Sequence, residues 1–283
     1  MFIVKRIFNK NLQIPLYRTY TVNSKIIEVT KDDIDIATIS MAHPPVNCLN
    51  KELLNALNTS LMNVQKQKCQ GVILTSSLSN IFSAGIDLKE IYNRTEKQLS
   101  EYWTTIQNTW LTLYNLEIPI AAAINGSSPA GGCILAMSCE YRILVEGKYT
   151  IGLNETQLGI TVSEWMRALY VDIIGYRRAE LALLQGTLFH PKEALEIGLV
   201  DELALNKANA IERCQNYIKS FKNIPCKYIK GRQKTKMELR KHNSSWLKAN
   251  ANSDLNEFIT FVQSPNVQAN LKLYIEALQN KNV

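Results

Sequence analysis

The sequence predicts an α/β domain with a helical C-terminal region. Short runs rich in β-branched residues alternate with segments of helical periodicity through most of the first two thirds of the 283 residues. Strands that alternate with helices at this spacing are typical of α/β domains. From residue 191 onward the apolar residues recur at helical spacing, with polar connections between the segments. We therefore expect one sizeable domain followed by a helical appendage.

The predicted elements follow in order. Residues 34–41 read as a strand, and Asn50 can cap the next helix because its side chain can accept a backbone N–H of the first turn. The apolar residues of that helix are Leu53, Leu54, Leu57, Leu61 and Val64. Further strands are expected over residues 71–75, 118–124 and 141–145, with an apolar helix beginning near Gly131. Two amphipathic helices, over residues 253–261 and 267–278, end the chain and either cover an active site or pack against another subunit.

Composition excludes several classes of protein. The apolar fraction is 46% and the charged fraction 20%, which are ordinary values for a folded domain. No run approaches eighteen consecutive apolar residues, so we expect no membrane span. The six cysteines are scattered and form no C-x-x-C pair, which predicts reduced, buried thiols in place of a disulfide framework.

The N-terminal stretch differs from the rest in its charge. Residues 1–27 contain five Lys or Arg residues and no acidic residue. Cations spaced among apolar and hydroxylated residues are typical of a mitochondrial presequence, which we predict for residues 1–24, with cleavage between about residues 18 and 25. A basic arm that binds an acidic surface is the alternative. Without residues 1–27 the net charge falls from +7 to +2, which argues against a nucleic-acid partner. The chain also lacks a C-terminal Ser-Lys-Leu, which favours the mitochondrial matrix.

Two glycine-containing segments follow predicted strands. Residues 82–88 read FSAGIDL and residues 125–133 read NGSSPAGGC. Small residues let a backbone approach a ligand closely, and the first N–H groups of a helix have no partner within it. Two N–H groups from separate loops that face one carbonyl oxygen would form an oxyanion hole. Singly, each segment is more often just a turn.

A third feature is Glu155, in a polar stretch between Ile151 and Leu158. A single Glu is usually a solvated surface residue, so its meaning depends on the two segments ahead of it. The order and spacing of all three features resemble the crotonase (enoyl-CoA hydratase/isomerase) superfamily. The similarity lies in residues 44–47, 82–88, 124–126, 129–133, 141–143 and 152–159, and it covers nearly everything after residue 25. The run GLNETQLG at residues 152–159 is close to a signature of the isomerase branch.

The resemblance implies a ClpP-like spiral of ββα units. Residues 25–205 would form the core with the active site, and residues 206–283 a helical region for assembly as a homotrimer or a dimer of trimers. It also implies an oxyanion hole made by the N–H groups of Ile86 and Gly131. Coenzyme A, as part of the substrate, would lie along Ala84, Gly85, Ile86, Asp87 and Leu88, with Gly131 beside the thioester. Asn154 and the catalytic Glu155 would face the acyl chain, and no metal or separate cofactor is implied.

The type of reaction depends on the number of carboxylates. A hydratase of this superfamily holds a water between two carboxylates, and the position of the second is Ile134 here. One base is sufficient for a 1,3-proton shift, so we expect conversion of 3-cis- or 3-trans-enoyl-CoA to trans-2-enoyl-CoA, a step in the β-oxidation of unsaturated fatty acids. Burial among apolar groups should raise the pKa of Glu155 toward the working range.

Other interpretations stay open at this stage. Dienoyl-CoA isomerases carry an extra aspartate near the position of Ser163, which Glu164 follows; thioester hydrolysis and a non-catalytic, RNA-binding scaffold are further alternatives. His43, His190 and His242 show no metal-ligand spacing. Cys133 is expected to be a buried thiol and not a nucleophile. Residues 230–241 carry six cations, which we expect mainly on a solvated helix face, with the CoA phosphates as a second role.

Overall fold

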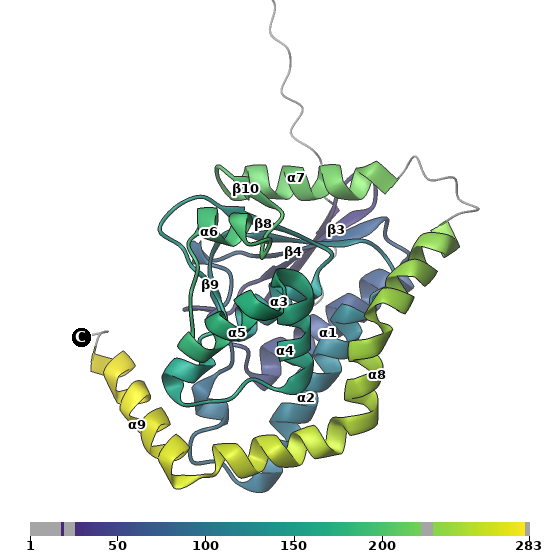
Figure 1. Ribbon diagram of the computed structural model, residues 1–283. Coiled ribbons are helices and arrows are strands. Elements are labelled where there is room, and N and C mark those ends of the chain that lie inside the picture. Colours follow the sequence, from purple (N-terminus) through teal and green to yellow (C-terminus); the bar gives the residue numbers. More distant parts are fainter. Residues whose placement is uncertain (1–17, 20–25, 222–228, 281–283) are drawn as a thin grey trace, which may run out of the picture.

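Two sheets organise the chain, as the computed structural model in Figure 1 shows; it describes residues 18–19, 26–221 and 229–280. The larger sheet has seven strands in the order β1-β2-β3-β4-β6-β8-β10, and the smaller one has three in the order β5-β7-β9. The large sheet consists of β1 (Arg18–Thr19), β2 (Ile27–Lys31), β3 (Ile36–Met41), β4 (Gly71–Ser76), β6 (Ile120–Ile124), β8 (Tyr141–Val145) and β10 (Glu202–Ala204). The small sheet consists of β5 (Asn80–Ile81), β7 (Gly126–Pro129) and β9 (Ile151–Gly152). From β3 to β10 the large sheet is parallel.

The two sheets are built by a repeated ββα unit, as expected. Each unit places one strand in the large sheet and the next in the small sheet before a helix returns the chain: β4, β5 and α2 (Glu96–Tyr114); β6, β7 and α3 (Gly131–Ser138); β8, β9 and α4 (Glu164–Ile174). Consecutive units therefore bring β5, β7 and β9 side by side, together with the turns that follow them. The predicted α/β spiral is confirmed.

The helices begin where the sequence provides caps. The Asn50 side chain accepts the Leu53 N–H at 2.9 Å and starts α1 (Lys51–Lys66), as predicted. Thr95 and Gln98 form a reciprocal capping box at the start of α2. The next helices are α5 (Tyr176–Gln185), α6 (Pro191–Glu196), α7 (Lys207–Ser220), α8 (Ile229–Val262) and α9 (Pro265–Asn280).

The parallel sheet is buried on both faces. The main core lies between the sheet and α1 to α4, and a smaller core lies under α7, with Ile73, Ala121 and Ile143 facing Cys214 and Ile218. Strands covered on both sides read as continuous apolar runs, which is why β4 and β6 were recognisable from sequence. In contrast, β2 and the three-residue β10 were not predicted.

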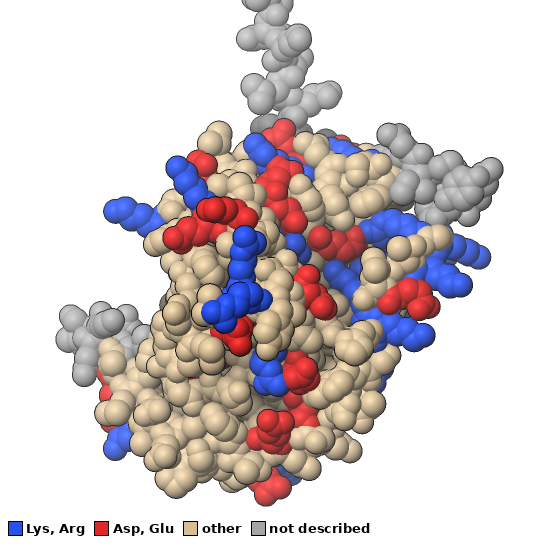
Figure 2. Space-filling view, viewed as in Figure 1, with Lys and Arg blue, Asp and Glu red and all other residues tan. Residues whose placement is uncertain are grey.

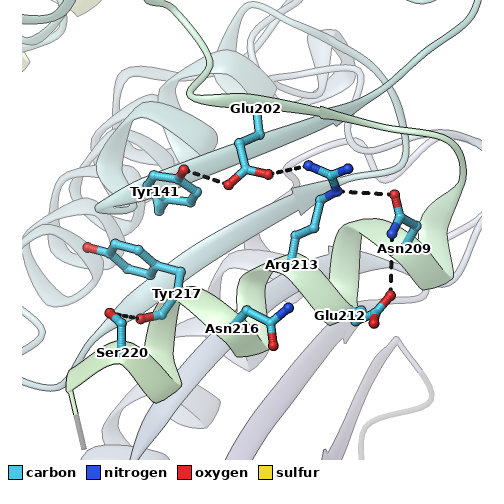
Figure 3. Close-up of a pocket in the computed structure, with 8 residues that line it drawn as sticks. All are labelled: Tyr141, Glu202, Asn209, Glu212, Arg213, Asn216, Tyr217 and Ser220. Carbon is cyan, nitrogen blue, oxygen red and sulfur yellow. Dashed lines mark hydrogen bonds and ion pairs between the residues drawn. The ribbon is translucent and has the colours of Figure 1, made fainter. Parts of the chain in front are cut away.

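A polar groove lies between α7 and the strands β8 and β10 (Figure 3). Its polar groups are mostly engaged with one another: the Tyr141 hydroxyl donates to Glu202 at 2.7 Å, and Arg213 pairs with the other oxygen of Glu202 at 2.5 Å. The Tyr141 and Tyr217 rings stack at 4.4 Å. The groove contains none of the residues expected at the active site.

The C-terminal helices correct one expectation. The helix expected over residues 253–261 is only the end of α8, a 34-residue helix, whereas α9 contains the predicted second helix. In Figure 1, α8 runs down one side of the helical layer and along its base. Asp254 on α8 accepts hydrogen bonds from the indole of Trp103 (2.7 Å), from Gln107 (2.8 Å) and from the indole of Trp165 (3.4 Å), which fixes α8 to both α2 and α4.

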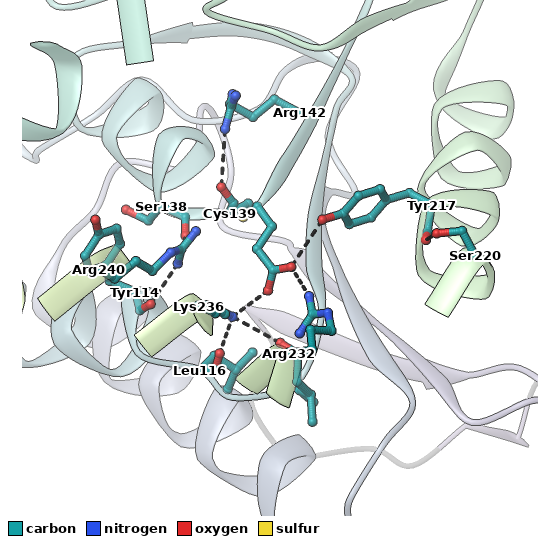
Figure 4. Close-up of polar contacts among 12 residues, drawn as sticks. Tyr114, Leu116, Ser138, Cys139, Arg142, Tyr217, Ser220, Arg232, Lys236 and Arg240 are labelled. Atoms are coloured by element: carbon teal, nitrogen blue, oxygen red, sulfur yellow. Dashed lines mark hydrogen bonds and ion pairs between the residues drawn. The ribbon is translucent and has the colours of Figure 1, made fainter. Parts of the chain in front are cut away.

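The basic segment at the start of α8 is only partly a solvated face. Figure 2 shows Lys and Arg gathered over this part of the surface, but Lys236 and Arg240 extend into the protein. Glu140, just before β8, pairs with Arg232 and with Lys236 at 2.5 Å, and the Tyr217 hydroxyl donates to it at 3.2 Å (Figure 4). Burial lowers the pKa of Lys236 to about 8, although Glu140 opposes this shift.

The N-terminal expectation lies mostly outside the described residues. Of residues 1–24 the structure describes only β1, in which Arg18 and Thr19 pair with Lys31 and Thr30 of β2. Within the described residues, no helix combines the length and apolarity that a membrane crossing requires.

We expect Glu140→Gln to lower the free energy of unfolding by about 3–5 kcal/mol, because it leaves two largely buried cations without their carboxylate. Urea denaturation followed by circular dichroism measures this change. Glu238→Gln is the matched control, because the Glu238–Lys241 ion pair is exposed and long, at 3.7 Å. This substitution should change the free energy of unfolding by less than about 0.5 kcal/mol. Equal effects of the two substitutions would contradict the structural role of Glu140.

Candidate active site

A buried asparagine supports the first glycine-containing loop. Asn47 is fully buried, and its amide donates to the Phe82 carbonyl at 2.9 Å and to the Ser76 hydroxyl at 2.8 Å. The Ser83 hydroxyl donates to the Asn47 carbonyl at 2.8 Å, and the Ala84 N–H donates to the Val46 carbonyl at 3.0 Å. The segment around Pro44-Pro45-Val46-Asn47 therefore sets the path of residues 82–85.

The two predicted loops meet backbone to backbone. A Cβ atom added to Gly85 would lie 2.9 Å from the Gly131 nitrogen, and one added to Gly131 would lie 3.2 Å from the Ile86 nitrogen. Gly85 also has φ +87°, which a residue with a side chain rarely adopts. Ile86 forms an isolated parallel bridge with Leu49, and Gly131 is the first residue of α3.

The N–H groups of Ile86 and Gly131 have no acceptor among the described residues. For Gly131 the reason is its place in the first turn of α3, where N–H groups lack helical partners. Two adjacent donors without acceptors form the arrangement that an oxyanion hole requires. The structure thus brings together the two residues to which the family resemblance assigns this role, although one lies 45 residues after the other.

Glu155 lies at the start of a short 3₁₀ turn, η2 (Glu155–Leu158), which begins after two residues that follow β9. The turn is fastened to α5: the Thr156 hydroxyl donates to the Leu183 carbonyl at 2.6 Å, and the Gln157 amide donates to the Gly186 carbonyl at 2.8 Å. Gly159 ends the turn in the left-handed conformation, φ +69°. These contacts hold the backbone of Glu155 at the end of the small sheet.

The carboxylate of Glu155 is desolvated and incompletely paired. Its Oε2 atom is buried without a hydrogen-bond partner among the described residues. Burial raises the pKa of Glu155 to about 7, and the hydrogen bond from its own backbone N–H only partly opposes the shift. A carboxylate with this pKa can accept and release a proton near neutral pH.

The charge of Glu155 affects the pKa values of two buried groups. After burial itself, Glu155 contributes to raising the pKa of the Cys133 thiol, and both Cys133 and Glu155 contribute to raising the pKa of the Tyr170 hydroxyl. The carboxylate is therefore close to α3 and α4. The Tyr170 hydroxyl is another buried polar group without a partner in the described structure, and nothing in the sequence pattern distinguished it.

An apolar cavity of about 30 Å³ adjoins the two residues of the predicted oxyanion hole. Ile86, Gly131 and Ile134 line it together with two tryptophans, Trp110 and Trp165. Ile134 is 4% exposed and occupies the position at which a hydratase of the resembled superfamily is expected to carry its second carboxylate. The other lining residues are Leu49, Leu54, Ile106, Thr109, Leu135 and Met166.

The remaining predicted binding residues lie around this centre. Ala84 and Leu88 are half-buried on the first loop, and Asp87 caps the 3₁₀ turn η1 (Leu88–Glu90) by accepting the Lys89 N–H at 3.0 Å. Asn154 is half-buried directly before Glu155 and packs beside Gly186. The structure thus keeps all of the predicted site residues in the two loops and the η2 turn.

The other candidates separate from the site. Glu164 is exposed on α4 and pairs with Arg167, so it supplies no second buried carboxylate. Cys133 is fully buried, and burial raises the pKa of its thiol, which makes it a poor nucleophile. Across the described ranges, no group of three or more His, Cys, Asp or Glu side chains is arranged to hold a metal ion.

We expect Gly132→Ala to lower the free energy of unfolding by about 1–3 kcal/mol, because a Cβ there would lie 2.4 Å from the Ser83 carbonyl oxygen and would force the two loops apart. Urea denaturation measures the loss. Gly231→Ala is the control: a Cβ at Gly231 meets nothing within 4 Å, so stability should stay the same or rise by up to about 1 kcal/mol. A Gly132→Ala protein as stable as the wild type would show that the contact can relax.

Comparison with known proteins agrees with this geometry. The family model described as enoyl-CoA hydratase/isomerase matches residues 32–282. The mitochondrial enoyl-CoA delta isomerase 1 of Mus musculus is 40% identical over 261 residues, which cover 92% of this chain and 89% of that protein. The Homo sapiens protein of the same name is 39% identical over 248 residues, covering 87% and 81%.

Solved structures agree in fold. The crystal structure of human mitochondrial delta3-delta2-enoyl-CoA isomerase matches with a TM-score of 0.87 and 37% identity, covering 91% of this chain and 100% of that chain. An enoyl-CoA hydratase from Bacillus halodurans, 23% identical with a TM-score of 0.77, shares the fold. The ββα spiral and a family match that spans most of the sequence lead to one conclusion: this chain belongs to the enoyl-CoA hydratase/isomerase, or crotonase, family.

Proposed function

We propose that this protein is an enoyl-CoA isomerase that converts 3-cis- or 3-trans-enoyl-CoA to trans-2-enoyl-CoA in the β-oxidation of unsaturated fatty acids. The observation that carries the proposal is the Glu155 carboxylate, whose Oε2 is buried without a partner among the described residues, on the ββα unit that follows the Ile86 and Gly131 N–H groups. Ile134 lines the apolar cavity beside those two residues, at the position expected for a second acid. The names of the mouse and human relatives, enoyl-CoA delta isomerase 1, support the same activity.

The proposed reaction is a 1,3-proton transfer. The Glu155 carboxylate removes a proton from C2 of the 3-enoyl thioester, and the electron pair delocalises onto the thioester oxygen. The N–H groups of Ile86 and Gly131 stabilise that oxygen, an effect for which one donor is typically worth about 10²–10³ in rate. The protonated Glu155 then returns the proton to C4 as the double bond forms between C2 and C3. One proton moves and no electron acceptor is required, so we propose no cofactor apart from the CoA of the substrate.

The apolar surroundings favour this reaction over its alternatives. Hydration needs a second group to hold or activate water, and Ile134 provides none. The exposed position of Glu164 argues against the two-carboxylate site of a dienoyl-CoA isomerase. An RNA-binding scaffold is disfavoured because three of the six cations of residues 230–241 are engaged inside the protein: Arg232 and Lys236 pair with Glu140, and Arg240 donates to two backbone carbonyls. Product analysis distinguishes isomerisation from thioester hydrolysis, because only hydrolysis releases a free acid.

We also propose the surroundings in which the enzyme works. CoA would lie along Ala84 to Leu88 with the acyl chain toward Asn154 and the cavity. Exposed apolar side chains on α5 and α9, including Leu184, Leu273 and Tyr274, support assembly into a homotrimer or a dimer of trimers. The basic residues 1–24 and the mitochondrial relatives support a location in the mitochondrial matrix.

Glu155→Gln should reduce isomerisation of 3-enoyl-CoA by about 10²–10⁴-fold, because it removes the base and leaves the loops in place. For the wild type, kcat/KM should fall as the pH drops below about 7, where the carboxylate becomes protonated. Absorbance of the conjugated product measures both effects, with mass spectrometry to identify products. Glu164→Gln is the control and should keep wild-type activity. Retained activity in Glu155→Gln, or a 3-hydroxyacyl or free-acid product, would overturn the proposal.

The same substitution should raise stability at high pH. The folded-state pKa of Glu155, about 7, lies above its ordinary value of 4.5, so the folded protein binds this proton more tightly and loses stability as the pH rises from 4.5 through 7. Relative to wild type, Glu155→Gln should therefore be more stable by about 2–3 kcal/mol at pH 8 and show little difference near pH 4.5. Denaturation curves across this range test the effect, and Glu164→Gln should show no such trend.

A further inference from the structure

The side chain of Gln268 joins the last helix to the loop that follows the oxyanion segment. Its Oε1 atom accepts the Asn93 N–H at 2.9 Å, and its Nε2 donates to the Ile91 carbonyl at 3.2 Å and to the Val262 carbonyl at 2.8 Å. One amide therefore holds the end of α8, the start of α9 and residues 91–93 together. Asn93 has φ +52°, the left-handed region that Asn adopts more readily than most residues, and in this conformation its N–H faces the Gln268 side chain.

Helix α9 also contacts the turn that carries Glu155. The Asn270 amide lies against Gly159, where an added Cβ would be only 2.7 Å from its nitrogen. Val267 and Leu271 on the same helix are buried, so α9 is held by apolar packing as well as by the hydrogen bonds of Gln268. The beginning of α9 thus lies between the end of the predicted CoA loop and the η2 turn.

The oxyanion residue itself is anchored independently of α9. The Leu49 N–H donates to the Gly85 carbonyl at 2.8 Å, and the Asp87 N–H donates to the Tyr102 hydroxyl at 3.1 Å. That hydroxyl in turn donates to the Leu49 carbonyl at 2.6 Å. Loss of the Gln268 contacts would therefore loosen residues 88–93 and leave the Ile86 N–H in place.

From this arrangement we infer that Gln268 is a positioning residue for the CoA part of the substrate. It acts through the loop at residues 88–93, which continues the segment Ala84 to Leu88, and the inference rests on the proposed function of that segment. When the three Gln268 hydrogen bonds are present, residues 88–93 are ordered before the substrate binds. Without them, binding has to order the loop, which weakens affinity for CoA esters and leaves the proton-transfer step unchanged.

Gln268→Met tests the inference, because Met has a similar length and makes none of the three hydrogen bonds. We expect KM for a 3-enoyl-CoA and Kd for free CoA, measured by calorimetry, to rise about tenfold, which corresponds to the net loss of one or two hydrogen bonds. The kcat should stay within about twofold of wild type. With the truncated 3-enoyl N-acetylcysteamine thioester, which lacks the nucleotide, kcat/KM should not change.

Gln263→Met is the matched control, since Gln263 is exposed at the turn between α8 and α9 and should behave as wild type. If Gln268→Met does not fold, Gln268→Glu, which keeps the acceptor for the Asn93 N–H, is measured in the same way. An unchanged KM and Kd, or an equal fall of kcat on both thioesters, would overturn the positioning role. A wild type that binds CoA but isomerises neither thioester would instead overturn the proposed function.

Discussion

The structure depends on the close approach of two main-chain segments at Gly85 and Gly131. Neither position has room for a side chain, because an added Cβ would be 3.2 Å or less from backbone atoms of the other segment. The approach is possible because the ββα repeat aligns β5, β7 and β9, so that the turns after successive strands come to the same edge. The proposed oxyanion hole is therefore a property of the backbone, set by the fold, while the proposed proton transfer depends on Glu155, a side chain of the next repeat.

Burial of that side chain, the Glu155 carboxylate, lowers the stability of the folded protein. A carboxylate with a buried, unpaired oxygen is unfavourable for folding, and burial of this kind usually costs a protein stability. The surrounding structure over-determines its place: η2 is fixed to α5, to the end of β9 and to α9. Stability is supplied elsewhere, by the apolar cores on both faces of the sheet. Separation of the rigid, well-paired regions from the strained functional one is consistent with an enzyme that keeps a base ready at neutral pH.

Much of the fold was predictable because its signals are local. The apolar strands β4 and β6, the Asn50 cap and the glycine-containing turns each follow from a few neighbouring residues. The pairing of Ile86 with Gly131 and the role of Glu155 came from resemblance to a family, since spacing alone does not bring separate loops together. The basic start of α8 was misjudged, because Lys236 and Arg240 look like surface residues until Glu140 and the carbonyls that receive them are located. Gln268 was also missed, because an amide that bonds to backbone carries no sequence signature.

The position of Gln268 so late in the chain has a consequence for the order in which the molecule is completed. Its bond to Asn93 spans 175 residues, so the loop receives this support only after nearly the whole chain has been synthesised. The strands and the two glycine-containing segments precede it and can pair earlier, since domains assemble as their segments emerge. A nascent chain would then bring the segments of Ile86, Gly131 and Glu155 together before Gln268 supports residues 91–93. Support for the proposed CoA loop would arrive only with α9.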